Sequence, residues 1–271
     1  MGEEKKKAVS KKHLKVTFLV VGLISVFALV FYFWQKNKNQ EEPEQPEKQQ
    51  EEVIEEEEEI KEEQEETEPE EVNPIDFAYW KSVNPDVYAW ISIGDTNIDY
   101  PILQSETDDS YYLEHTIDGV AGYPGSIYTE RVNAKDFSDF NTLIYGHDMK
   151  DGSMFKHLHK FEDKSFFDLH DTVKIYTETE IKTYRIYAAV IYDNRHIMYT
   201  YDNDNVVDRT AFIQSLQSVA GVGSFFREGM TIDENSKLIT LSTCITGQPN
   251  KRYIVVAAQV DSKETAKTIT E

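Results

Sequence analysis

The sequence has a single cysteine, Cys244, among its 271 residues. One thiol cannot form a disulfide within the chain, so a disulfide-stabilised fold is excluded. A free cysteine is most often a small buried hydrophobic residue, and this is the first interpretation of Cys244. Only the residues around it can favour a chemical role instead.

The chain also lacks an internal repeat, a metal-ligand spacing and an excess of basic residues. Acidic residues outnumber basic ones by 50 to 28, and the excess persists after residue 71, which argues against a nucleic-acid partner. His157 and His159 are only two residues apart, which on a helix places them on different faces, and we interpret both as surface residues. The sequence therefore predicts no bound metal and no cofactor.

One long apolar run is present near the N-terminus. Residues 16–34 carry no charge, and as a helix they span roughly 28 Å, close to the ~30 Å hydrocarbon core of a bilayer. Six lysines precede the run, which places that end in the cytoplasm. The run is longer than the apolar part of a signal peptide, and no small-residue cleavage site follows it. We therefore predict a cytoplasmic tail over 1–15, a retained transmembrane helix over 16–34 and an extracellular remainder.

Residues 35–72 are predicted to be a linker. Between Glu41 and Glu71 there are 18 glutamates against two lysines, so this stretch repels itself and can bury little apolar surface. We expect a disordered spacer that lifts a domain away from the membrane. The remaining residues, 73–271, are enough for one domain with its own core.

Short β-branched and aromatic runs separated by turn residues fill this domain, a pattern typical of an all-β barrel or sandwich. Eight strands are predicted, over residues 87–93, 97–103, 125–130, 141–145, 172–177, 182–192, 237–243 and 252–260. Helical insertions are predicted around 154–170 and 208–220. Asn73-Pro74 and Asn84-Pro85 each place a capping residue before a proline, which predicts short helices at the start of the domain.

The last two predicted strands bring a cation to the cysteine. Strand alternation places Leu238, Thr240, Ser242 and Cys244 on one face, with Cys244 at the end of its strand. Seven loop residues follow, and Arg252 begins the next strand. If these strands pair as a hairpin, Cys244 and Arg252 face each other across its open end. A nucleophilic cysteine needs a base or a cation to lower its pKa, and the oxyanion formed from an attacked carbonyl needs a donor.

A histidine ends another predicted strand. The strand over 141–145 is followed by Gly146 and His147, and the glycine would let another backbone or a substrate come close. His147 is therefore a candidate partner for Cys244. The residue pattern alone leaves His115 and His196 open as competitors.

Together these motifs resemble the catalytic signature of the sortases, and most of all that of class B. The resemblance rests on Thr240-Leu-Ser-Thr-Cys244 followed by Arg252, with Leu-Ile-Tyr-Gly-His147 about a hundred residues earlier. It covers roughly residues 74–261 and includes the segments 97–104, 111–115 and 125–128 and the helical insertion at 208–220. The short loop between Cys244 and Arg252 is similar to that of clostridial-type members.

The resemblance implies an eight-stranded sortase-type β-barrel and a cysteine transpeptidase anchored in the membrane of a Gram-positive cell. Its partners would be secreted proteins with a C-terminal sorting motif similar to Asn/Ser-Pro-x-Thr-Gly/Asn, and a peptidoglycan amine as acceptor. It implies that Cys244 attacks the threonine carbonyl, that Arg252 stabilises the oxyanion and that His147 acts as general acid and base. Ser242, on the same strand face as Cys244, would line the substrate groove.

The sequence departs from the family in one place. Many relatives have an acidic residue directly after the cysteine, whereas this chain has Ile245. The carboxylates that could replace it are Asp148, after the histidine, and Asp233, before the cysteine strand, and we interpret both as surface charges.

Other functions remain open at this point. The same cysteine and histidine could serve a secreted cysteine peptidase or hydrolase, and a sortase could polymerise pili instead of anchoring proteins to the wall. A non-catalytic binding module with a buried Cys244 is a third possibility.

Overall fold

The computed structural model describes residues 71–266. Its strands are β1 (Glu71–Val72), β2 (Val87–Ser92), β3 (Asp99–Leu103), β4 (Ile127–Tyr128), β5 (Asn141–Tyr145), β6 (Thr172–Tyr176), β7 (Glu180–Asp193), β8 (Phe225–Phe226), β9 (Leu238–Cys244) and β10 (Lys251–Ala266). Its helices are α3 (Phe77–Val83), α4 (Lys164–Leu169), α5 (Ile197–Thr200) and α6 (Val206–Ser218), with 3-10 helices η1 (Tyr111–Leu113) and η2 (Phe155–Glu162).

The predicted cytoplasmic tail, membrane helix and nearly all of the predicted linker lie outside the described residues. Within 71–266, no helix has the length and apolar character needed to cross a bilayer. The last two residues of the predicted linker, Glu71 and Val72, form β1, which pairs in parallel with the end of β10. The folded domain therefore begins at least two residues earlier than the composition indicated.

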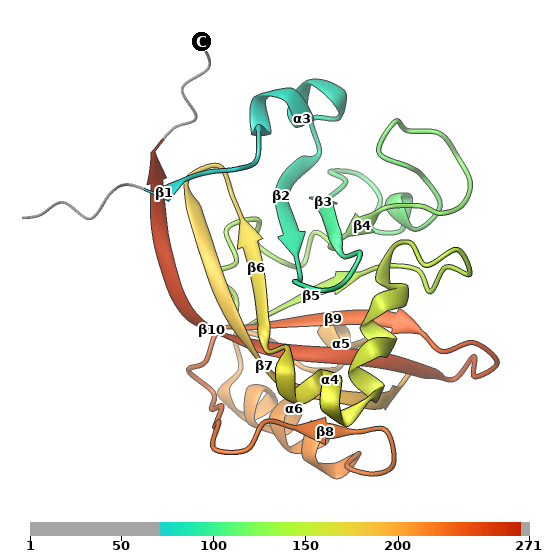
Figure 1. Cartoon of the computed structure of the whole chain (residues 1–271), viewed down its shortest axis with the longest axis vertical. Coiled ribbons are helices and arrows are strands. Elements are labelled where there is room, and N and C mark those ends of the chain that lie inside the picture. The colour runs from blue at the N-terminus through green and yellow to red at the C-terminus, as the bar shows by residue number, and fades with distance from the viewer. Residues whose placement is uncertain (1–70, 267–271) are drawn as a thin grey trace, which may run out of the picture. The chain divides into compact units, whose positions relative to one another are not determined.

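Eight strands close into a barrel. The order is β10-β9-β5-β4-β3-β2-β6-β7, and β7 pairs back onto β10 along most of its length. The two-residue strands β1 and β8 extend this ring at β10 and β7. Each of the eight barrel strands overlaps one of the eight predicted strands, so the predicted all-β barrel is confirmed. Figure 1 shows β9 and β10 running side by side, with α6 and β8 below them in this view.

Strand alternation separates two apolar clusters. The barrel interior takes one face of every barrel strand and includes Ile239 and Leu241 of β9. The opposite face of β5, β7, β9 and β10 packs against α5 and α6 and includes Leu238 and Ile254. Because side chains alternate along a strand, Ser242 and Cys244 belong to the same face as Leu238. The predicted face assignment is therefore correct, and that face lies outside the barrel.

The two predicted helical insertions are confirmed, but the predicted helix starts are partly wrong. Residues 154–170 contain η2 and α4, and α6 occupies the second insertion. A single helix, α3, lies between β1 and β2, and Asp76 caps its N-terminus by accepting a hydrogen bond from the Tyr79 N–H. Asn84 ends this helix instead of starting another: its backbone N–H bonds to the Trp80 carbonyl, and its side chain bonds to Tyr112 Oη and the Ile117 carbonyl.

Candidate active site

Cys244 and Arg252 are direct partners across the β9–β10 hairpin. The six residues of β9 that precede Cys244 are buried, whereas Cys244, the last residue of the strand, is exposed. The predicted hairpin is therefore confirmed, and the interpretation of Cys244 as a buried core residue is wrong. The Arg252 guanidinium donates through Nη1 to the carbonyls of Pro249 (3.1 Å) and Lys251 (2.8 Å), which fixes one edge of the fork.

His147 follows the end of β5, which runs parallel to β9. Tyr145 is level with Ser242, and the ladder continues through a 3.2 Å bond from the Gly146 N–H to the Ser242 carbonyl. His147 and Cys244 each come two residues after this last pair in their own segments. Its Nε2 lies 2.7 Å from the Leu113 carbonyl, which can only accept, so Nε2 carries a proton and Nδ1 is left for other partners.

The glycine before the histidine allows close packing of side chains. A Cβ at Gly146 would lie 2.5 Å from Ile127 Cδ1 and 2.6 Å from Phe155 Cγ. Both neighbours are fully buried in the barrel core. The close approach predicted at Gly146 is present, but core side chains make it, not another backbone or a substrate.

We expect Gly146→Ala to lower the free energy of unfolding by about 1–3 kcal/mol, because the added methyl group overpacks a core that has no room for it. Chemical denaturation followed by tryptophan fluorescence would measure the change. Gly94→Ala is the matched control, because no heavy atom lies within 4 Å of a Cβ at Gly94. Equal stability of the two variants would contradict the packing argument.

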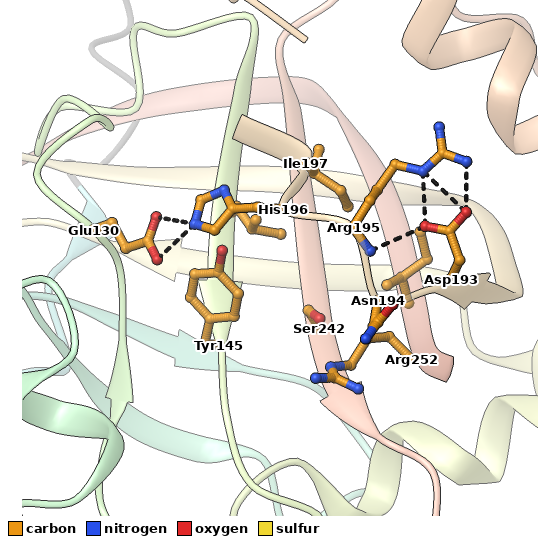
Figure 2. Close-up of a pocket in the computed structure, with 11 residues that line it drawn as sticks. Glu130, Tyr145, Asp193, Asn194, Arg195, His196, Ile197, Ser242 and Arg252 are labelled. Carbon is orange, nitrogen blue, oxygen red and sulfur yellow. Dashed lines mark hydrogen bonds and ion pairs between the residues drawn. The ribbon is translucent and has the colours of Figure 1, made fainter. Parts of the chain in front are cut away.

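A hollow of about 160 Å³ opens beside Arg252 on the outer face of the barrel. Its lining includes Tyr145, His196, Ser242, Arg252 and Ile254. Figure 2 shows Ser242 between Tyr145 and Arg252 in this view. Ser242, 6% exposed, contributes to the wall of the hollow, and Arg252 connects the hollow to the hairpin that carries Cys244.

A carboxylate and a histidine form an ion pair at one end of this hollow. Glu130 Oε2 lies 2.9 Å from His196 Nε2, as the dashed lines of Figure 2 mark. Burial raises the pKa of Glu130, although the hydrogen bond and charge of His196 offset part of that rise. Burial also raises the pKa of Tyr145, so its phenol stays neutral and can donate.

The two competing histidines have partners of their own. His115 stacks on Tyr111 with ring centroids 3.9 Å apart, and its Nδ1 contacts the Tyr111 carbonyl. His196 is held by Glu130. Neither histidine follows a strand that pairs with β9, so the geometry favours His147. Among the described residues, no group of three or more His, Cys, Asp or Glu side chains could hold a metal ion.

Comparison with known proteins agrees with this arrangement. The sortase domain family matches residues 91–260, which include Cys244, His147 and Arg252. The chain belongs to the sortase family. The resemblance to sortases predicted from the sequence is therefore confirmed, and the barrel is a sortase barrel.

The relatives of this sortase carry class B names. Sortase B of Listeria monocytogenes is 38% identical over 166 residues, which are 61% of this chain and 65% of that protein, slightly less than two thirds of its length. The crystal structure of Clostridium perfringens sortase B has a TM-score of 0.61 at 28% identity and covers 68% of this chain and 99% of that one. A Streptococcus pyogenes class B sortase involved in pilus biogenesis has a TM-score of 0.59 at 29% identity and covers 69% of this chain and 98% of that one.

Two side chains of this sortase site were missed by the sequence analysis. His159, interpreted as a surface residue, contacts the Cys244 carbonyl through Nε2 at 3.0 Å. Asp148, interpreted as a surface charge, has a side chain only 4% exposed. Asp233 does lie at the surface, where it hydrogen-bonds within its own turn to Asn235 and Ser236. The missed contacts are long-range, and no local spacing signals them.

Proposed function

We propose that this protein is a membrane-anchored, class B-type cysteine transpeptidase that acts outside a Gram-positive cell. It cleaves a C-terminal sorting motif of secreted proteins after threonine and joins the new end to a peptidoglycan amine. The motif resembles Asn/Ser-Pro-x-Thr-Gly/Asn. The anchor is residues 16–34, and the reaction requires neither metal nor cofactor.

The reaction has two halves. The Cys244 thiolate attacks the threonine carbonyl, and Arg252 stabilises the oxyanion that forms. The C–N bond then breaks, the leaving amine takes a proton from His147, and a thioester remains on Cys244. An acceptor amine attacks the thioester, gives a proton back to His147 and expels the thiolate. One amide is exchanged for another, and both protein groups return to their starting states.

The observation that carries this proposal is the meeting of three strand ends. Cys244 and Arg252 are paired across the β9–β10 hairpin, and His147 follows the parallel neighbour β5. Three neighbouring strands therefore carry the exposed thiol, the guanidinium and the imidazole, and Arg252 and Ser242 of these strands also line the hollow on the outer face. Membership of the sortase family and the class B names of the relatives support the same chemistry.

The test is product analysis by mass spectrometry. The protein would be mixed with peptides of the Asn/Ser-Pro-x-Thr-Gly/Asn pattern, with and without an amine such as triglycine or a diamino acid. A ligated product that depends on the amine is expected. Cleavage at the same rate without an amine, and no ligated product with one, would favour the secreted hydrolase instead.

Pilus polymerisation is a second candidate because the Streptococcus pyogenes relative is a class B sortase involved in pilus biogenesis. It differs only in the acceptor, which would be a lysine of a second protein. Supplying lysine-bearing pilin-like peptides in place of peptidoglycan amines would distinguish the two.

Arg252→Lys is expected to lower kcat/KM by roughly 10²-fold, the usual cost of removing an oxyanion donor. Lysine keeps the positive charge, but it lacks the two edges of a planar guanidinium. It therefore cannot bond to the Pro249 and Lys251 carbonyls on one side and face the oxyanion on the other. Steady-state kinetics with a fluorogenic sorting peptide would measure the loss. Arg185→Lys, at an exposed ion pair with Asp171, is the control. Wild-type turnover in Arg252→Lys would remove the oxyanion role.

A further inference from the structure

The last β5–β9 pair is Tyr145 with Ser242, so β5 has ended before β9 reaches Cys244, and His147 lies beyond the end of its strand. The segment after His147 folds back, with the Phe155 N–H bonding to the His147 carbonyl at 2.9 Å. The segment after Cys244 is a turn in which residues 246–250 are all exposed. The β5–β9 ladder therefore stops at the Gly146 N–H, one residue before His147, and contacts beyond it can set the distance between the two reactive residues.

A buried carboxylate connects these two segments. The Thr246 hydroxyl donates to Asp148 Oδ2 at 2.8 Å, joining the residue after His147 to the second residue after Cys244. Lys156 lies 2.9 Å from the other carboxylate oxygen. Burial alone would raise the pKa of Asp148, but the hydrogen bonds from Lys156 and Thr246, with the charge of His159, outweigh it and hold this pKa below its usual range. The carboxylate is thus stabilised in its ionised form.

The helix η2 supplies a second connection. In a 3-10 helix, residues three apart lie on the same side, so Lys156, His159 and Glu162 form one row. His159 Nε2 contacts the Cys244 carbonyl at 3.0 Å and lies 3.8 Å from Asp148 Oδ2. Its Nδ1 contacts Glu162 at 2.6 Å, and its ring stacks on Tyr253.

Arg252 also holds the loop through the Pro249 carbonyl, and the Gln248 N–H bonds to the Ile245 carbonyl, but neither bond involves the segment after His147. Ile245, directly after the cysteine, packs against the barrel core and carries no charge. We propose that Asp148, Thr246 and His159 act as a clamp that positions the Cys244 thiol against His147. These are positioning residues, not catalytic residues, since they touch the backbone and loop of the nucleophile and not the thiol. The expected effect on kcat rests on the proposed function. The expected effect on the reactivity of the Cys244 thiol does not.

The first test is the reactivity of the thiol, measured as the rate of alkylation by iodoacetamide in the full-length protein. Asp148→Asn and Thr246→Val should each slow alkylation several-fold, because the thiol loses its fixed place beside the imidazole. Thr246→Ser keeps the hydroxyl and should restore the wild-type rate. Asp233→Asn removes a carboxylate that does not contact the loop, and it should have no effect.

The second test is the split between kcat and KM with a sorting peptide that the wild-type protein cleaves. Asp148→Asn and Thr246→Val should each lower kcat roughly tenfold with KM within about twofold, since misplacing reacting groups affects the chemical step. The double variant should be no slower than the slower single variant, because the two side chains form one unit. A purely structural role would lower the melting temperature and leave kcat per folded molecule unchanged.

The outcomes separate this inference from the proposed function. Wild-type alkylation and kcat in both Asp148→Asn and Thr246→Val would overturn the clamp and leave the transpeptidase intact. Losses that multiply in the double variant would also overturn it. A wild-type protein that forms no thioester with any sorting peptide would instead contradict the proposed function, and the alkylation rates would still decide the clamp.

Discussion

Cys244→Ala is expected to reduce transpeptidation by roughly 10⁴-fold or more while the barrel stays folded. Alanine has no nucleophile, so no thioester can form and both halves of the reaction stop. Because Cys244 is exposed at the end of β9, the substitution leaves no core cavity, and the free energy of unfolding should change by less than about 0.5 kcal/mol. Turnover assays and intact-protein mass spectrometry of the thioester adduct would measure the first effect, and chemical denaturation would measure the second.

The exposure of Cys244 also decides between two earlier interpretations. A non-catalytic module with a buried cysteine predicts a thiol that resists alkylation in the folded state, whereas the exposed thiol of this structure should react. If Cys244→Ala still ligated a sorting peptide to an amine, the assignment of the nucleophile would be wrong, since it is the only cysteine of the chain.

His147→Ala is expected to cause a loss of roughly 10²–10⁴-fold, the usual contribution of general acid–base catalysis. Without the imidazole, the leaving amine has no proton donor and the acceptor amine has no base. Single-turnover kinetics should show both acylation and aminolysis slowed, because the same group serves both steps. The fold should remain cooperative, as the ring is only partly buried and its described hydrogen bond goes to the Leu113 carbonyl.

His115→Ala is the control for this result. His115 stacks on Tyr111 and follows no strand that pairs with β9, and its removal should leave turnover within about twofold of wild type. The reverse outcome, normal turnover in His147→Ala and a large loss in His115→Ala, would transfer the acid–base role to His115. A loss in His196→Ala alone would instead indicate a role of His196 in the hollow that it lines with Arg252.

The strand content could be predicted from the sequence because it depends on local patterns. Each barrel strand is a short β-branched or aromatic run between turn residues, and alternation along β9 correctly placed Ser242 and Cys244 on one face. The helix starts were less reliable. Asn84 has the residue pattern of an N-cap, but its backbone N–H bonds to the Trp80 carbonyl and makes it the C-cap of α3, while its side chain bonds to Tyr112 and Ile117, far along the chain.

The clamp of Asp148, Thr246 and His159 was missed because it depends on which way the side chains of η2 point. His157 and His159 do point in different directions, as predicted, but both meet partners: His157 accepts from the Asn97 N–H, and His159 meets Cys244. Asp148 could be recognised only as a charge next to His147. Its burial depends on Thr246 and Lys156, which contribute from two other segments of the chain.

The sequence by itself determined the barrel strands and the position of Cys244, Arg252 and His147 at or just beyond strand ends, because strand periodicity and turn residues are local properties. The hairpin between Cys244 and Arg252 could also be foreseen, since only a short loop separates them. Only the tertiary structure decided that β5 pairs in parallel with β9, bringing His147 to a cysteine about a hundred residues later. It also decided that Asp148 and His159 support the nucleophile. Strand order and loop packing depend on contacts between distant segments, and no local pattern encodes these contacts.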